Sequence, residues 1–204
     1  MEKMSNYLLW NRFKEGDIDA LTKLYREYTN DLYTYGLKII NDENLVKDCI
    51  QEVFIQLIDK RKSLLVTPRT HIYLFKSLRN KLFEESRSKG KRENILKRLP
   101  GDDEPYEFSP EQLTIESEEK QNVQIEIKKA IEKLTDRQQE VIFLKYTEDF
   151  NYDEIAELLH IDKASVRTLV YRSLKNIKKS FGPKSFLLLN VLQSIRFPNT
   201  RYTN

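Results

Sequence analysis

Basic and hydroxyl side chains recur along residues 163–179 with a spacing that suits binding rather than catalysis. Thr168, Tyr171, Arg172, Lys175 and Lys179 project from one side of a predicted helix. The opposite side carries a stripe of mainly apolar residues at about 100° per residue, which would face a core. Such a basic helix face can bind phosphates and the edges of bases.

The preceding residues predict the elements that must present this face. Thr135 with Gln138, and Asn151 with the glutamate three residues later, form two capping boxes that mark helix starts. The residues His160 and Ile161 leave room only for a sharp turn, after which Asp162 is a suitable N-cap. A short helix behind a longer basic one predicts a helix-turn-helix that enters a DNA major groove. An ordinary helical hairpin with a solvated face is the alternative.

A second group of polar side chains lies on a predicted helix over residues 44–60. Asp48 and Glu52 are four residues apart, with Gln51 and Gln56 beside them, and no base follows either acid at the supporting spacing. The other side of this helix is apolar and includes Cys49. The acid–amide face therefore suits docking of a basic partner, although a merely solvated face would look the same.

Hydrophobic periodicity predicts an all-α protein with two small helical domains, because no segment shows strand alternation and no internal repeat is present. Proline, glycine and acidic residues separate the two lobes and predict a flexible linker. We expect domains at residues 8–98 and 123–181, an acidic linker at 99–122 and a C-terminal tail at 182–204. Within the first domain, Thr67 and Pro68 are expected to open a helix.

Charge is distributed unevenly, although the net charge is only +3. Residues 163–204 contain nine Lys/Arg and no acid, and residues 76–98 contain nine bases against three acids. Residues 99–119 contain eight acids and no base. Two basic blocks around an acidic one suggest two surfaces that face nucleic acid, joined by a linker that avoids or mimics nucleic acid.

Composition excludes several classes of function. The single cysteine and two histidines are too few for a disulfide or for a zinc site with the usual ligands. There is no glycine-rich phosphate loop and no nucleophile–base pair, so we expect no catalytic residue, no metal, no cofactor and no enzyme activity. The N-terminus lacks a signal-like apolar run, and the longest apolar stretch is too short to span a bilayer, so we expect a cytoplasmic protein.

Three segments taken in order resemble one known family. LYREYTNDLYTYGLKIINDENLVKDCIQEVFIQLIDK, YLFKSLRNKLFE and LTDRQQEVIFLKYTEDFNYDEIAELLHIDKASVRTLVYRSLKNIKK are similar to the extracytoplasmic-function (ECF) sigma factors of the sigma-70 family. The resemblance covers the chain except for the linker and the tail. The middle segment is similar to versions found in Bacteroidetes.

The resemblance implies a function and a role for each matching residue. It implies a sigma factor that binds core RNA polymerase (its β and β′ subunits) and directs promoter recognition and transcription initiation. The core-binding stretch, region 2, would include Asp48, Gln51, Glu52 and Phe54. The promoter −10 element would be bound by Arg79, Asn80, Lys81 and Arg87. A flipped base of this element would be captured beside them. Region 4 would read the −35 element through Lys163, Ser165, Arg167, Thr168 and Arg172, with phosphate contacts from Lys175, Lys178 and Lys179.

The family pattern also gives expectations for the linker, the turn and the tail. The linker would thread through the polymerase toward the RNA exit path. His160 stands where the family has glycine, which predicts a positive φ or a slightly different turn. Leu169 and Leu174 stand at positions where basic side chains are common in the family's recognition helix. Because fewer basic side chains weaken −35 readout, promoter choice is expected to depend partly on a recruiting protein bound by the tail. An anti-sigma factor is a further expected partner.

Two other classes of protein remain as alternatives. A regulator with a response-regulator-type helix-turn-helix would place a sensor or receiver domain at the N-terminus, and the acid cluster at a strand end that such a domain needs is missing. A helical adaptor without sigma activity would bind a partner but would not support promoter-dependent transcription.

Overall fold

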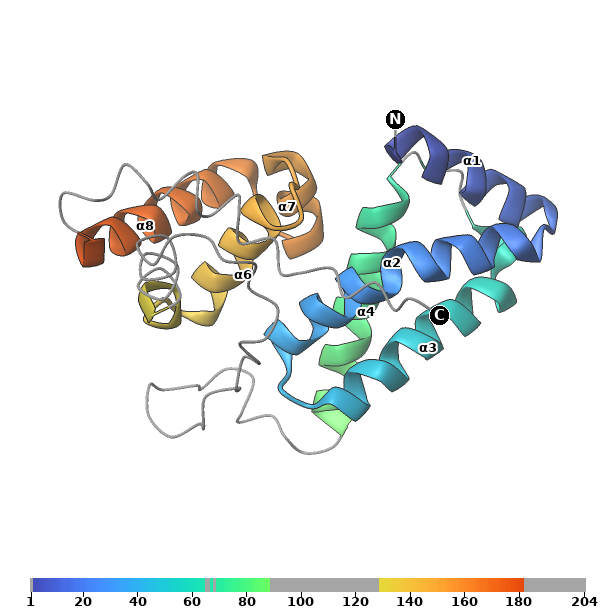
Figure 1. Ribbon diagram of the computed structural model, residues 1–204, viewed down its shortest axis with the longest axis horizontal. Helices are drawn as coiled ribbons and strands as arrows, with labels where there is room; N and C mark the ends of the chain where they lie inside the picture. Colours follow the sequence, from blue (N-terminus) through green and yellow to red (C-terminus); the bar gives the residue numbers. More distant parts are fainter. Residues whose placement is uncertain (1, 65–66, 68, 89–128, 182–204) are drawn as a thin grey trace, which may run out of the picture. The chain divides into compact units, whose positions relative to one another are not determined.

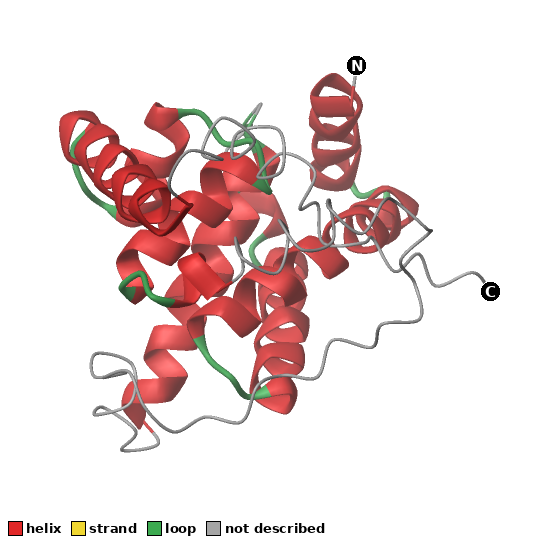
Figure 2. Cartoon of the chain, turned by 60° about the vertical axis from the view of Figure 1, so that its left-hand side comes forward, coloured by secondary structure: helices red, strands yellow, loops and turns green. Residues whose placement is uncertain are grey.

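The computed structural model describes residues 2–64, 67, 69–88 and 129–181, and every regular element in these ranges is a helix (Figure 2). The described residues up to Ser88 belong to one compact unit and those from Lys129 onward to another. The all-α prediction with two helical units is confirmed. The expected acidic linker and C-terminal tail lie outside the described residues.

Unit 1 contains four α-helices and one short 3-10 helix (Figure 1, blue to green). Helix α2 contacts α1, α3 and α4, and α3 also packs on α4. The first helix begins at Glu2, before residue 8, where the sequence placed the start of the domain. The elements are α1 (Glu2–Glu15), α2 (Ile18–Ile39), α3 (Glu43–Asp59), η1 (Arg61–Ser63) and α4 (Thr70–Ser88).

Aspartate side chains fix the starts of α2 and α3. Asp17 accepts a hydrogen bond from the backbone N–H of Ala20 at 3.1 Å, and this bond together with the Arg12 guanidinium lowers the pKa of Asp17. Asp42 accepts from the N–H of Leu45 at 3.0 Å in the same way. Such caps satisfy N–H groups that have no partner within the helix.

The predicted start of α4 is displaced. The Thr67 hydroxyl accepts a hydrogen bond from the backbone N–H of Arg69 at 3.1 Å, before the helix begins at Thr70. The first helical bond runs from the N–H of Tyr73 to the carbonyl of Arg69. Thr67 therefore shapes the turn that precedes the helix and is not its N-cap.

The core of unit 1 combines aromatic side chains from α1, α2 and α4 with the apolar face of α3. Trp10, Phe13, Tyr35 and Phe75 are almost fully buried. Ile58, in the last turn of α3, is 48% exposed. The buried residues of α3 are Leu45, Val46, Cys49, Ile50, Val53, Phe54 and Leu57.

Unit 2 contains α6 (Asp136–Tyr146), α7 (Tyr152–Leu159) and α8 (Lys163–Phe181) (Figure 1, yellow to red). Helix α8 contacts both others. Residues 129–132 are also helical and form the described end of the first helix predicted for this domain. The capping boxes predicted at Thr135 and Asn151 are both present. Val166, Val170, Ser173 and Ile177 are buried, which confirms the predicted core stripe of α8.

Gly36 allows α2 and α3 to approach closely. A Cβ atom at this position would lie only 2.5 Å from Cγ1 of Val46, which is fully buried. Two packed helices can approach so closely only where one of them carries no side chain.

We predict that Gly36→Ala lowers the free energy of unfolding of unit 1 by about 1–3 kcal/mol, because the new methyl group overpacks the helix contact. Chemical denaturation followed by circular dichroism measures this loss. Val46→Ala in the same chain should recover part of it. Lys23→Ala, at an exposed site of the same helix, should change stability by less than about 0.5 kcal/mol. Equal effects at positions 36 and 23 would contradict the tight contact.

Candidate nucleic-acid and protein interfaces

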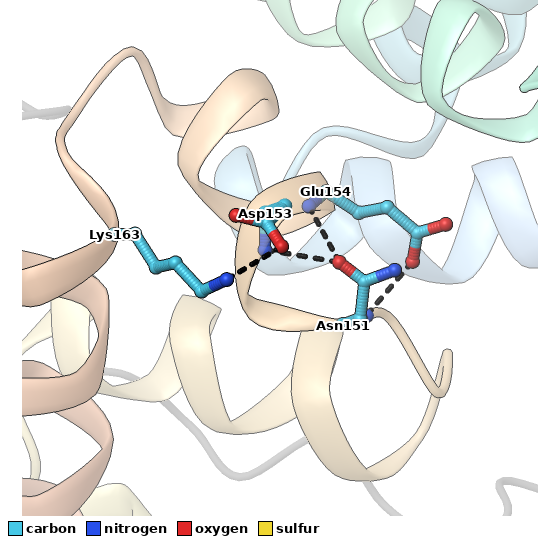
Figure 3. A network of polar contacts seen from close by, with 4 residues as sticks. All are labelled: Asn151, Asp153, Glu154 and Lys163. Atoms are coloured by element: carbon cyan, nitrogen blue, oxygen red, sulfur yellow. Dashed lines mark hydrogen bonds and ion pairs between the residues drawn. The ribbon is translucent and has the colours of Figure 1, made fainter.

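The start of α7 is held by a polar network that also reaches α8 (Figure 3). The Asn151 side chain accepts hydrogen bonds from the N–H groups of Asp153 at 2.9 Å and Glu154 at 3.0 Å. The Glu154 carboxylate, only 5% exposed, accepts the N–H of Asn151 at 2.8 Å. Asp153 points the other way and forms a 2.7 Å ion pair with Lys163, the first residue of α8.

The turn between α7 and α8 contains a left-handed residue. His160 has φ 52°, as the replacement of the family's glycine predicted. The backbone N–H of Ile161 donates to the carbonyl of Ala156, and Arg137 of α6 donates to the carbonyl of Leu159 at 3.0 Å. The carbonyl of Ala156 thus accepts a second bond besides the helical one from the N–H of His160, and Arg137 provides a donor for a carbonyl at the very end of α7. The predicted sharp turn is confirmed.

Helix α8 begins at a well-formed cap and presents a basic face. Asp162 accepts the N–H of Ser165 at 2.8 Å and its hydroxyl at 2.5 Å, and these bonds lower the pKa of Asp162. Of six side chains predicted for −35 contact, Thr168, Arg172 and Lys175 lie on the outward side of the helix, opposite its buried stripe, and Lys163, Ser165 and Arg167 lie nearer its flanks. All are exposed except Ser165, which is half-buried.

These six side chains differ in how far they are already engaged within unit 2. Lys163 is paired with Asp153, and the Thr168 hydroxyl donates to the carbonyl of Ala164 at 3.0 Å. Arg167 lies 5.8 Å from the ring centroid of Tyr152. Within the described part of the chain, Arg172 and Lys175 form no ion pair or hydrogen bond. These two are therefore the side chains with most freedom to reach a ligand.

Tyr171 is a surface feature that the list of predicted contacts omitted. Its side chain is 66% exposed and lies next to Arg172 on α8. An exposed aromatic ring on a basic helix face offers apolar contact to a thymine methyl group. The periodicity of the helix placed Tyr171 on this face, so the sequence did contain the signal.

The acid–amide face of α3 points outward. Asp48, Gln51 and Glu52 are all exposed, whereas Phe54 is 5% exposed and packs edge-on against Tyr25, with ring centroids 4.9 Å apart. Phe54 therefore supports the face from inside and is not part of its surface. Ile55, which the sequence did not single out, is 55% exposed. One turn after Gln51, it adds an apolar centre to the polar face.

Helix α4 carries the four residues predicted for −10 contact, and they are placed differently. Asn80 and Arg87 are exposed, and the Arg79 guanidinium lies 4.5 Å from the ring centroid of Phe83. Lys81 is 16% exposed and faces α3, where it pairs with Glu52 at 2.5 Å. Hydrogen bonds with the carboxylates of Glu52 and Glu85 raise the pKa of Lys81. The orientation of Lys81 therefore departs from that of an outward DNA contact.

Cys49 lies beneath this ion-pair cluster. It is 1% exposed, which confirms its predicted place in the core. Burial, reinforced by the negative charges of Glu85 and Glu52, raises the pKa of the thiol to about 11. A protonated, buried thiol is a poor nucleophile.

Comparison with known proteins finds one family whose members resemble the chain. Residues 124–177 match the family model described as sigma-70, region 4. Two relatives from Bacillus subtilis (strain 168) are each 26% identical to the chain. They are the ECF RNA polymerase sigma factor SigX, over 76% of this chain and 80% of the relative, and SigM, over 80% and 96%. The chain is thus similar over most of its length to ECF sigma factors, and its region 124–177 matches a sigma-70 family domain.

The fold of the chain also resembles that of a solved structure. The solved structure of the sigma factor RpoE in complex with the anti-sigma factor NepR from Bartonella quintana has a TM-score of 0.58 to this chain. It covers 78% of this chain and 95% of RpoE at 18% identity, a likeness of fold. Among the described helices, none is long and apolar enough to cross a membrane.

We predict that Asn151→Ala destabilises unit 2 by about 1 kcal/mol, because two backbone N–H groups lose their acceptor at the start of α7. Thermal unfolding of the full chain measures the change. Asn151→Asp keeps the acceptor and should retain most of the stability. An alanine variant as stable as the original chain would mean that the cap contributes nothing.

Proposed function

We propose that this chain is a promoter-selecting sigma factor that binds core RNA polymerase through unit 1 and reads promoter DNA through both units. The observation that carries the proposal is that one chain combines an outward acid–amide face on α3 with a helix-turn-helix, formed by α7 and α8, whose second helix is basic. Its ECF relatives match across most of the chain. The match in residues 124–177 also favours this function over a response-regulator-type protein.

Core binding is assigned to the α3 face formed by Asp48, Gln51, Glu52 and Ile55. Its acids complement a basic partner, and charge complementarity sets both the encounter rate and the register of an interface. Ile55 would exclude water at the centre of the contact. The partner is the clamp helices of the polymerase β′ subunit.

Promoter −10 recognition is assigned to α4. Asn80 and Arg87 are exposed and Arg79 lies along the same helix. Arginine and asparagine combine phosphate contact with hydrogen bonds to base edges. A flipped base would be held beside this helix, at a cost of a few kcal/mol for unstacking.

Promoter −35 recognition is assigned to α8. Arg172, Tyr171 and Thr168 would contact base edges, and Lys175, Lys178 and Lys179 would contact phosphates. Lys163, Ser165 and Arg167 complete the proposed contact set near the start of the helix.

The remaining assignments concern the domains, the linker, the tail and the location. Residues 8–98 and 123–181 would act as the two promoter-binding domains. The acidic linker at 99–122 would occupy the path of the emerging RNA, and the tail at 182–204 would bind a recruiting protein. An anti-sigma factor is a further proposed partner. The chain would act in the cytoplasm and contribute no catalysis, because nucleotide addition belongs to the polymerase.

Run-off transcription with purified bacterial core polymerase tests this function. Adding the chain to a fragment library of its own genome should give discrete transcripts that start a fixed distance downstream of a shared two-part motif. Tight core binding without discrete starts would point to an adaptor or a missing recruiting protein. Failure to bind core polymerase would overturn the proposal.

We predict that Asp48→Asn weakens core binding at least about fivefold, because a charge that complements the basic partner is lost from the proposed interface. Binding of labelled chain to core polymerase by fluorescence anisotropy measures the effect. Glu43→Gln removes one charge from an exposed residue at the start of the same helix and should leave affinity unchanged. Equal losses in the two variants would indicate long-range attraction in place of a defined contact.

We predict that two neighbouring basic residues of α8 contribute differently to promoter binding by the holoenzyme. Arg172→Ala should cost about 1–3 kcal/mol and relax sequence preference at one position of the −35 element. Lys175→Ala should weaken all promoters alike and reduce the slope of log affinity against log salt by about 1. Gel-shift titrations at several salt concentrations separate these outcomes. A uniform loss from Arg172→Ala would show that it contacts phosphate only.

A further inference from the structure

Lys81 is surrounded by three carboxylates at the contact between α3 and α4. Its Nζ atom lies 2.5 Å from Oε2 of Glu52, 3.1 Å from Oε1 of Glu85 and 4.0 Å from Oε2 of Glu84. The lysine side chain is 16% exposed, whereas that of Glu52 is 47% exposed. One half-buried cation therefore meets a carboxylate that belongs to the proposed docking face.

The ion pair matters more to Glu52 than to Lys81. Glu84 and Glu85 stand three and four residues after Lys81 on its own helix, the spacing at which acids pair with a lysine without help from another helix. Glu52 has no such support on α3. Asp48 precedes it by four residues and repels it, and Gln56 follows by four residues.

We propose that Lys81 is a positioning residue for core-polymerase binding, which fixes the Glu52 carboxylate on the docking face of α3. This inference rests on the proposed function. Holding one carboxylate oxygen leaves the other free for a basic partner and removes the rotamer freedom that binding would otherwise have to restrict. Lys81 also offsets the charges of Glu84 and Glu85, which would otherwise push Glu52 away from this orientation.

A double-mutant cycle in core affinity tests the role of Lys81. Lys81→Met removes the charge and keeps the length of the side chain, and Glu52→Gln removes its partner. The cycle is run at raised salt, which screens the general attraction of a more acidic surface for core polymerase. Lys81→Met should weaken core binding about threefold to tenfold in the original chain, and should have almost no effect beside Glu52→Gln.

Two results of this cycle would overturn the inference. Equal losses with and without Glu52 would mean that Lys81 acts independently of it. Unchanged core affinity combined with weaker promoter binding by the holoenzyme would make Lys81 a DNA contact instead. A chain that does not bind core at all would overturn the proposed function and this inference together, whereas a binding chain with an additive cycle would overturn the inference alone.

The single cysteine of the chain provides a readout that separates positioning from simple stabilisation. Cys49 is 1% exposed, and its thiol interacts electrostatically with the charges of Glu85, Glu52 and Lys81. If Lys81→Met leaves the α3–α4 contact closed, a thiol reagent should label Cys49 within about twofold of the original rate. Much faster labelling would show that Lys81 only holds the two helices together, which would contradict the proposal.

Two further variants serve as controls. Lys81→Arg keeps the positive charge and should restore most of the core affinity lost in Lys81→Met. Lys47→Met removes a lysine from α3 whose partner is Glu43, outside the docking face, and should leave core affinity unchanged. A loss in Lys47→Met as large as that in Lys81→Met would contradict a specific role for Lys81.

Discussion

Burial of the apolar face of α3 against α2 and α4 is the interaction on which unit 1 depends. Val46 meets the bare backbone of Gly36 on α2, and Phe54 packs under Tyr25 of the same helix. Because this face must point inward, the opposite face with Asp48, Gln51 and Ile55 must point outward. The proposed docking surface is thus a consequence of core packing, and its rigidity comes from the same contacts.

Unit 2 depends in a similar way on polar groups that end one helix and begin the next. Asn151 and Glu154 satisfy the start of α7, His160 adopts the left-handed conformation that ends it, and Asp162 starts α8. Each element follows the previous one after only a few residues, so these local bonds set the direction of α8. The buried stripe of α8 then fixes which side of the helix presents its lysine and arginine side chains.

The two proposed interfaces differ in which of their polar and charged side chains already have partners within the chain. On α8, Lys163 and Thr168 have partners inside unit 2, whereas Arg172 and Lys175 extend outward. On unit 1, Glu52 shares its charge with Lys81 of α4. The outward side chains can therefore contact a ligand without giving up a partner, whereas the paired ones also hold the geometry of the surface.

The sequence alone determined the features that depend on neighbours along the chain. Helix caps at Asp17, Asp42, Asn151 and Asp162, and the buried stripe of α8, follow from side-chain chemistry within one or two helical turns. The tertiary structure decided which helices meet. Packing of α4 on α3 turned Lys81 toward Glu52, and Ile58 of α3 is 48% exposed although an isoleucine in this helix could equally be a core residue. Periodicity gives the side of a helix on which a residue lies, whereas its burial and its distant partners depend on contacts between segments far apart in the sequence.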